Sequence, residues 1–464
     1  MELRVRTSSL LLPLALALAI AIVSVDVVSA QQKFGINYGQ IANNLPDPTQ
    51  VSGLLKSMNV NKVKLYDADP KVLTAFANTG VEFIIAVGNE NLQTIASSSG
   101  AARQWVSQHV QPFIPATRIT CIAVGNEVFT SNDTGMMASL VPAMQAIHGA
   151  LGDLGLDKQV TVTSAHSVNF LASSFPPSTG VFREDLAVYI KPMLDFHGQT
   201  GSPLLINAYP FFAYKADPGS VSLPYVLFEP NPGVRDPNTN LNYDNMLYAQ
   251  IDAVYAAMKV MGHTDVPVRI SETGWPSKGD DDEAGATVQN AAAYNGNLMQ
   301  RIAMGQGTPL KPNVPVDVYV FALFNEDMKP GPASERNYGL FYPNGSPVYS
   351  IKASTGGGGG SGIGPGGSFN DPYYTSMFSS SSRLAVRPID GRAGITESSG
   401  ISEHDVSDGG GCPARRIIPL SFLHTSHPER KARKSLGVSL LTDATRSELS
   451  SPLICAGGLT ARTE

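Results

Sequence analysis

The chain has 464 residues, of which 42% are hydrophobic and 16% are charged. This apolar content can build a large core, which excludes a fully disordered or fibrous protein, and three cysteines are too few for a fold built on disulfides. The net charge is −6, with the negative excess before residue 383, so the composition offers no basic footprint for nucleic acid.

Residues 1–30 are predicted to be a secretory signal peptide. Two arginines precede an apolar run from Leu10 to Val23, and small residues follow up to Ala30, where cleavage is expected. An uncleaved membrane anchor is the alternative, but this run is shorter than the roughly 20 residues of a spanning helix. Secretion to the extracellular space or cell wall would make the sequons at Asn132 and Asn344 glycosylation sites.

Eight strand-like apolar runs follow in chain order. They are Phe34–Asn37, Val63–Tyr66, Glu82–Val87, Ile119–Val124, Val160–Ser164, Leu204–Ala208, Val266–Ser271 and Val316–Leu323. Most lack alternation, which is typical of parallel strands buried on both faces. Helical periodicity lies between them, for example at 244–261 and 291–303, so residues 31–352 are predicted to form an α/β fold, a (β/α)8 TIM barrel. A doubly wound open sheet is the alternative, although no Gly-rich phosphate turn follows the first run.

The C-terminal part of the chain has a different composition. Residues 353–382 are predicted to be a Gly/Ser-rich linker, and residues 383–464 are predicted to be a mostly disordered tail. A basic arm that binds an anionic wall polymer or a membrane is the alternative for the tail. Whether Cys412 and Cys455 form a disulfide is left open by the sequence.

Glutamates end two of the predicted strands. Glu127 follows the fourth run and Glu272 lies at the end of the seventh, on the face of a barrel where active sites form. Glycoside hydrolysis requires two facing carboxyl groups, one protonated to donate to the leaving oxygen and one ionised to attack or to activate water. Strands four and seven lie on roughly opposite sides of an eight-stranded barrel, so these two side chains can flank one bond. Salt-bridged or solvated glutamates at the barrel mouth are the alternative.

The third and fourth runs lead into the same five-residue sequence. Ala86–Glu90 and Ala123–Glu127 are identical five-residue blocks, and spacing alone does not decide between Glu90 and Glu127.

Five longer blocks strongly resemble plant endo-β-1,3-glucanases of glycoside hydrolase family 17. They are Phe34–Gly39, Val63–Asp67, Ile119–Phe129, Ile270–Ser277 and Phe321–Tyr342. The resemblance covers about residues 33–352 and implies a (β/α)8 barrel that cleaves β-1,3-glucan with retention of configuration and without a cofactor. It also implies that Glu127 is the general acid/base, that Glu272 is the nucleophile, and that Glu90 is a groove-lining or structural residue.

The resemblance extends to supporting residues. Glu326, Lys329 and Glu335 match acidic and basic positions that the family keeps around the site, where they either tune charge or touch sugar. Retention predicts carboxyl groups about 5–5.5 Å apart, and an ionised Glu272 is expected to raise the pKa of Glu127.

Further residues at the strand ends are candidates for sugar binding. Asn126 is placed to hydrogen-bond a sugar hydroxyl, Tyr209 to donate its hydroxyl to the nucleophile, and Tyr38 to lie at the barrel mouth. Aromatic faces match the apolar faces of glucose, so we expect sugar contacts from a second group, with core packing as the alternative for each of its members: Phe212, Trp275 and Phe324.

The predicted function is therefore a secreted retaining endo-β-1,3-glucanase that acts as a monomer on β-1,3-glucan, from callose or fungal walls. A mixed-linkage β-1,3;1,4-glucan hydrolase and a non-catalytic glucan-binding wall protein are the alternatives. The scattered histidines show no metal-ligand spacing, and the acidic run Asp280–Glu283 is predicted to be a solvated helix start. Membrane attachment is expected only if a native isoform carries a glycolipid anchor.

Overall fold

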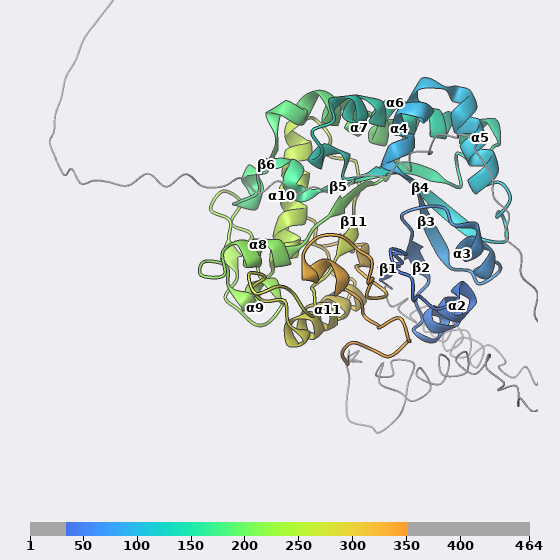
Figure 1. Ribbon diagram of the computed structural model, residues 1–464. Coiled ribbons are helices and arrows are strands. Elements are labelled where there is room, and N and C mark those ends of the chain that lie inside the picture. The colour runs from blue at the N-terminus through green and yellow to red at the C-terminus, as the bar shows by residue number, and fades with distance from the viewer. Residues whose placement is uncertain (1–33, 351–464) are drawn as a thin grey trace, which may run out of the picture. The chain divides into compact units, whose positions relative to one another are not determined.

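The computed structural model describes residues 34–350, and at its centre eight parallel strands form a closed barrel (Figure 1). The strands are β1 (Gly35–Asn37), β2 (Lys62–Lys64), β3 (Glu82–Val87), β4 (Arg118–Asn126), β5 (Thr161–Ser167), β8 (Leu204–Asn207), β11 (Val268–Thr273) and β12 (Val318–Val320). Each neighbours the next in chain order, and β12 closes the barrel against β1. The predicted TIM barrel is confirmed, and each predicted run overlaps one barrel strand. Closure excludes the open sheet.

Helices surround the barrel (Figure 1). They are α2 (Pro48–Ser57), α3 (Pro70–Ala75), α4 (Leu92–Ser97), α5 (Ser99–His109), α6 (Thr134–Asp153), α7 (Ala187–Thr200), α8 (Pro210–Ala216), α9 (Leu223–Val226), α10 (Met246–Val260) and α11 (Val288–Ala303). The helices predicted from periodicity at 244–261 and 291–303 are confirmed as α10 and α11.

Shorter elements lie in the connections. Two antiparallel pairs are β6 (Leu171–Ser173) with β7 (Val181–Phe182), and β9 (Val234–Arg235) with β10 (Asn242–Tyr243). The single-turn 3-10 helices are η1 (Asn89–Asn91), η2 (Val128–Thr130), η3 (Val168–Phe170), η4 (Pro177–Thr179), η5 (Glu184–Leu186) and η6 (Ala333–Arg336).

The apolar runs lack alternation because both faces of each strand are buried. One set of side chains packs against the helices and the other fills the barrel interior. The interior cluster contains Ile84, Ala86, Cys121, Ala123, Ala165, Leu205 and Tyr319. Cys121 is a free, buried thiol, as expected of a lone cysteine in a strand.

Ion pairs occupy the N-terminal ends of the strands. Lys62 Nζ lies 3.0 Å from one carboxylate oxygen of Asp317, and Arg269 Nε lies 2.8 Å from the other. Arg118 and Glu82 form a similar pair between neighbouring strands. These charges are at the opposite end of the barrel from the strand ends where Glu127 and Glu272 lie.

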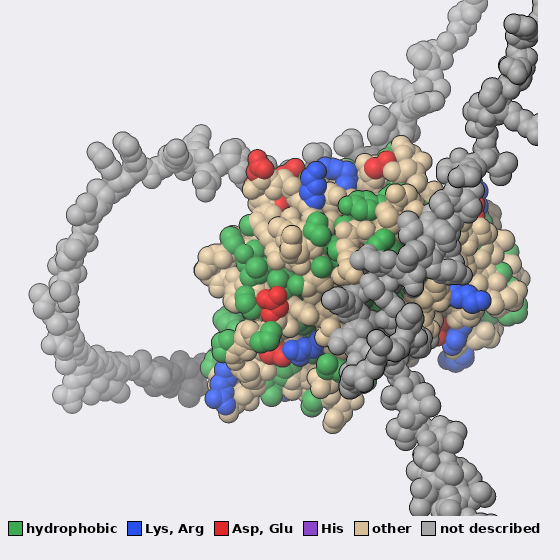
Figure 2. All heavy atoms as spheres, turned by 90° about the horizontal axis from the view of Figure 1, so that it is seen from below, with side chains coloured by type: hydrophobic (Ala, Val, Ile, Leu, Met, Phe, Trp, Pro, Cys, Tyr) green, Lys and Arg blue, Asp and Glu red, His purple; other side chains and the backbone are tan. Residues whose placement is uncertain are grey.

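Charge on the surface is mixed. Figure 2 shows the molecule from below, and on the described part of this face Lys and Arg side chains are interspersed with Asp and Glu rather than gathered into a basic patch. Within residues 34–350, no helix combines the length and apolar character needed to cross a membrane. The predicted signal peptide (1–30), linker (353–382) and tail (383–464), including Cys412 and Cys455, lie outside the described residues.

One buried carboxyl group lies away from the barrel mouth. Asp252 of α10 is 1% exposed, and its Oδ2 accepts a hydrogen bond from the Leu310 amide at 2.9 Å. Burial raises its pKa to about 6, although hydrogen bonds from Thr308, Leu310 and Tyr243 oppose the rise. Ionised Asp252 is therefore a source of instability at neutral pH.

Asp252→Asn is expected to stabilise the protein at pH 7.5 by about 1–2 kcal/mol and to have little effect near pH 4. The pKa of Asp252 is raised in the folded state, so the stability of the native chain falls as the pH rises through about 6. Unfolding in denaturant at both pH values measures this difference. Asp153→Asn, which breaks an exposed pair with Arg103, is the control, and an equal gain at both pH values would contradict the assignment.

Candidate active site

A left-handed turn places Glu127 at the end of β4. Gly125 has φ 72° and Glu127 has φ 53°, and the Glu127 amide donates to the carbonyl of Ala165 at 2.7 Å. A Cβ atom on Gly125 would lie 2.8 Å from Val128 Cγ2, so glycine is required at this position both by its backbone angle and by the space available. This turn redirects the chain after the strand and anchors Glu127 on β5.

The identical blocks at 86–90 and 123–127 lie side by side in register. Ala86 pairs with Ala123 between β3 and β4. Just beyond the strands, the Asn89 side chain donates to the Asn126 carbonyl at 2.9 Å and accepts from the Asn126 amide at 2.8 Å. Glu90 itself is exposed and accepts a hydrogen bond from Asn91. The earlier block thus supports the later one through Asn89.

Glu272 of β11 is buried and has charged and polar partners. It is 6% exposed, and its Oε1 lies 2.6 Å from Nζ of Lys64, which is itself 1% exposed. Its Oε2 accepts from the Tyr209 hydroxyl at 2.9 Å, so the predicted contact between these residues is present. The Tyr66 hydroxyl donates to Asn37 Oδ1 at 3.2 Å and also helps to lower the pKa of Glu272.

Glu127 and Glu272 are linked through Asn207 of β8. The Asn207 amide donates to Glu127 Oε1 at 3.0 Å and more weakly to Asn126 Oδ1 at 3.4 Å. Its oxygen accepts from the Ser271 hydroxyl at 2.6 Å, and Asn207 pairs with Glu272 across the β8–β11 ladder. Asn207 therefore contacts both Asn126 and Glu127.

The two glutamates have pKa values displaced in opposite directions. Burial and the nearby charge of Glu272 raise the pKa of Glu127 to about 7, against the opposing effects of Asn207 and Lys64. Burial alone would raise the pKa of Glu272, but the charge and hydrogen bond of Lys64 and the tyrosine hydroxyls outweigh it, and the pKa is lowered. Near neutral pH the pair therefore combines a proton donor with an ionised carboxylate.

A second charged group lies at the end of β12. Glu326 is buried and accepts from the Ile41 amide at 2.8 Å, and burial raises its pKa. Lys329 Nζ lies 3.5 Å from Glu335 and 4.3 Å from the centre of the Phe321 ring. The charge of Glu335 contributes to the raised pKa values of both Glu127 and Glu326, so these residues belong to the same electrostatic environment.

The predicted aromatic contacts divide into two groups. Phe212 is 45% exposed, and its ring centre lies 5.4 Å from that of Tyr209, so its face is available to a ligand. Trp275 is 0% exposed and donates to the Gly285 carbonyl, and Phe324 is 2% exposed and packs edge-on against the buried Tyr38. The expectation that Trp275 and Phe324 offer ring faces to sugar is corrected, because the loops after β11 and β12 bury both rings.

The sequence did not single out Lys64, Tyr66 or Asn207. Each lies within or just after a barrel strand, which is the signal that identified Glu127 and Glu272. Lys64 was the most recognisable of the three, because a lysine between the apolar residues Val63 and Leu65 of a buried run needs a buried anion.

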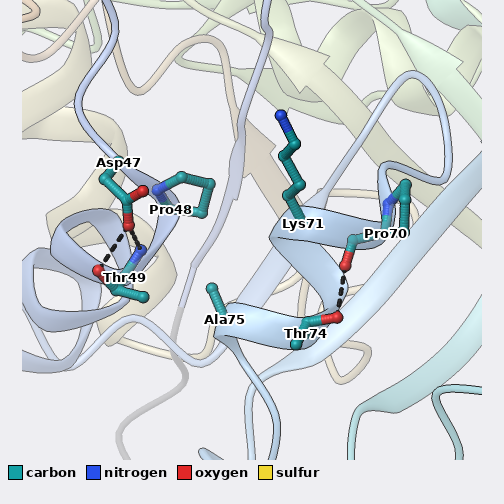
Figure 3. Close-up of a pocket in the computed structure, with 7 residues that line it drawn as sticks. All are labelled: Asp47, Pro48, Thr49, Pro70, Lys71, Thr74 and Ala75. Carbon is teal, nitrogen blue, oxygen red and sulfur yellow. Dashed lines mark hydrogen bonds between the residues drawn. The ribbon is translucent and has the colours of Figure 1, made fainter.

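A separate surface hollow of about 600 Å3 lies between the N-terminal ends of α2 and α3 (Figure 3). Its lining residues are Asp47, Pro48, Thr49, Pro70, Lys71, Thr74 and Ala75. Asp47 accepts from the Thr49 amide and caps α2, so its carboxylate is engaged within its own turn. The hollow contains neither of the paired glutamates. Among residues 34–350, no group of His, Cys, Asp or Glu side chains is arranged to hold a metal ion.

Comparison with known proteins agrees with this geometry. The family model for glycosyl hydrolases family 17 matches residues 34–353. Glucan endo-1,3-beta-glucosidase 14 of Arabidopsis thaliana is 61% identical over 320 residues, which cover 69% of this chain and 82% of that protein. Glucan endo-1,3-beta-glucosidase 11 of the same plant is 57% identical over 319 residues, covering 68% and 75%.

Solved structures share the barrel. CJP38, a beta-1,3-glucanase and allergen of Cryptomeria japonica pollen, matches with a TM-score of 0.67 and 40% identity, covering 70% of this chain and 99% of its own. A structure from a pair of plant beta-glucan endohydrolases with distinct substrate specificities matches with a TM-score of 0.64 and 36% identity, covering 68% and 99%.

Lys64→Met is expected to raise the pKa of Glu272 above the usual range of about 4.3 for glutamate, because burial is then no longer offset by a cation. Carbon-13 NMR of labelled glutamate carboxyl groups, with Glu272→Gln to assign the signal, measures this pKa. Lys62→Met is the matched control, because Lys62 lies on the same strand but pairs with Asp317 at the other end of the barrel. An unchanged titration of Glu272 in Lys64→Met would refute the role of Lys64.

Proposed function

The chain belongs to glycosyl hydrolases family 17, and we propose that it is a retaining endo-β-1,3-glucanase in which Glu272 is the nucleophile and Glu127 the general acid/base. The observation that carries this proposal is the divergence of the two pKa values within one hydrogen-bonded group. Lys64 keeps Glu272 ionised, while burial and the charge of Glu272 keep Glu127 protonated.

In the first step, the Glu272 carboxylate attacks the anomeric carbon while Glu127 donates its proton to the departing glycosidic oxygen. A bond forms between Glu272 and the sugar, and the bond to the leaving chain breaks. Tyr209 and Lys64 hold the two oxygens of Glu272, which limits its rotation before attack.

In the second step, Glu127 accepts a proton from water as that water attacks the anomeric carbon and releases Glu272. Formation of the glycosyl ester removes the negative charge of Glu272, which is one cause of the raised pKa of Glu127. The pKa of Glu127 therefore falls when a base is needed and rises again when Glu272 is released.

The proposed substrate is β-1,3-glucan, because the curated relatives are named as glucan endo-1,3-beta-glucosidases. The exposed ring of Phe212 beside Tyr209 supports a sugar contact next to the nucleophile. A mixed-linkage β-1,3;1,4-glucan is the second candidate, since one solved relative comes from plant beta-glucan endohydrolases of distinct specificities. Comparison of rates on the two polymers separates these candidates.

We further propose that the protein is secreted to the cell wall as a monomeric glycoprotein. Asn132 and Asn344, the acceptor residues of the two sequons, are exposed. Asn132 lies in the connection before α6, and Asn344 lies in the turn after Phe341. Peptide mapping of the native protein, with and without glycosidase treatment, tests the signal cleavage after Ala30, both glycans and the presence of the tail.

Glu272→Gln is expected to lower the rate of hydrolysis of soluble β-1,3-glucan by at least about 10³-fold, because an amide cannot form the glycosyl ester. Products of the unmodified enzyme, resolved by size, should be short oligosaccharides. Release of glucose alone would indicate exo action instead. A folded native protein that binds glucan without turnover would replace the proposal with a glucan-binding function.

The value of kcat/KM for β-1,3-glucan is expected to fall as the pH rises through about 7, because Glu127 must be protonated in the free enzyme. The leaving group of an activated aryl β-laminaribioside needs no proton. The pH profile of the first step measured with this substrate should therefore show no alkaline limb. Glu127→Ala with added azide should yield the β-glycosyl azide, and formation of the α-anomer would contradict retention.

A further inference from the structure

Glu283 is a buried carboxylate that the proposed mechanism does not use. Its side chain is 0% exposed and lies in the connection between β11 and α11. Oε1 accepts from Lys215 Nζ at 2.8 Å and from the Ser334 hydroxyl at 2.6 Å. Oε2 accepts from the amides of Ser334 and Asp280 at 2.9 and 3.1 Å. The prediction of a solvated helix start is wrong for this residue.

These contacts join three connections that follow barrel strands. Lys215 lies in the last turn of α8, which begins directly after Tyr209 and carries Phe212. Ser334 lies in η6, beyond β12. Asp280 reinforces the link, because its Oδ2 accepts from the Ala333 amide at 2.8 Å. Glu283 therefore fastens η6 to the connections that follow β8 and β11.

The η6 segment also organises the second charged group of the site. It carries Glu335, which pairs with Lys329. Its last residue, Arg336, donates to the carbonyls of Lys329 and Gly331 at 3.0 and 2.9 Å. The η6 segment thus carries Glu335 and is bonded to the backbone of Lys329.

We propose that Glu283 is a positioning residue for the glycosidase site, whose buried charge holds η6 and so fixes how far the charge of Glu335 lies from Glu127. This inference rests on the proposed function. An amide in place of the carboxylate keeps one acceptor oxygen, so either the Ser334 and Asp280 amides or Lys215 and the Ser334 hydroxyl lose their acceptor. The segment that carries Glu335 is then free to move outward.

The expected signature is electrostatic. Three charged groups face Glu127: Glu272 from β11, Lys64 from β2 and Glu335 from η6. Glu335 is the one among them that lies on the segment fastened by Glu283. Burial opposes ionisation of Glu283, but its hydrogen bonds to Lys215 and Ser334 lower its pKa to about 2, so Glu283 does not itself titrate over the assay range.

The test is the pH profile of kcat/KM for soluble β-1,3-glucan, measured on the full chain. Glu283→Gln, which preserves side-chain volume, should move the alkaline limb to lower pH by a few tenths of a unit, because a more distant Glu335 raises the pKa of Glu127 less. Glu335→Gln should move it in the same direction. The double variant should match Glu335→Gln alone, because Glu283 acts through Glu335.

Asp317→Asn is the matched control, because it removes a carboxylate that pairs with Lys62 and Arg269 at the far end of the barrel. It should lower the melting temperature without moving the alkaline limb. Should Glu283→Gln fail to fold, Ser334→Ala removes one bond to Oε1 and should give a smaller shift of the same sign.

Two results would overturn the inference: an alkaline limb that stays in place in folded Glu283→Gln, or shifts that add in the double variant. Inactivity of the unmodified enzyme on β-1,3-glucan would instead refute the proposed function, so the two failures are distinguishable.

Discussion

The ion pair between Lys64 and Glu272 brings opposite charges into contact at the barrel mouth, where both are almost fully buried. Lys64 lies on β2 and Glu272 on β11, and β1 and β12 lie between them in the ring of strands. The contact therefore crosses the inside of the barrel and depends on its closure. Burying either charge alone would cost several kcal/mol. The attraction between Lys64 and Glu272 offsets this cost for both residues. Lys64, which stabilises the buried anion, also keeps Glu272 ionised.

The remaining electrostatics of the mouth follow from how its acids are paired. Glu272, Glu283 and Glu335 each have a lysine within 3.5 Å, from β2, α8 and the connection after β12 respectively. Glu127 instead accepts a hydrogen bond from the neutral amide of Asn207. A neutral amide offsets the effect of burial on the pKa of Glu127 less than a lysine would. The ionised Glu272 raises this pKa further. The different partners of the two glutamates thus favour the protonated form of Glu127 and the ionised form of Glu272.

Much of this arrangement was predictable because it depends on local patterns. Apolar runs bounded by turns predicted each barrel strand. Strand-end positions made Glu90, Glu127 and Glu272 candidates, and the family resemblance selected Glu127 over Glu90. Contacts across the barrel were not predictable in this way. The hydrogen bond from Asn207 to Glu127 joins residues 80 positions apart, and the burial of Trp275 depends on the loop that brings Gly285 over its ring. The sequence identifies an aromatic residue near a site, but the loops decide whether its face is open.

The repeated block shows the same division between local and distant information. The identical five-residue blocks at 86–90 and 123–127 make different contacts, because different parts of the structure surround them. Just after β4, the left-handed Glu127 is bonded to β5 and accepts a hydrogen bond from Asn207. Glu90 instead lies in a separate turn, η1, and is exposed. The earlier block contributes Asn89, whose side chain satisfies both backbone groups of Asn126. Thus the later copy carries Glu127, and the earlier copy fixes the backbone from which Glu127 projects.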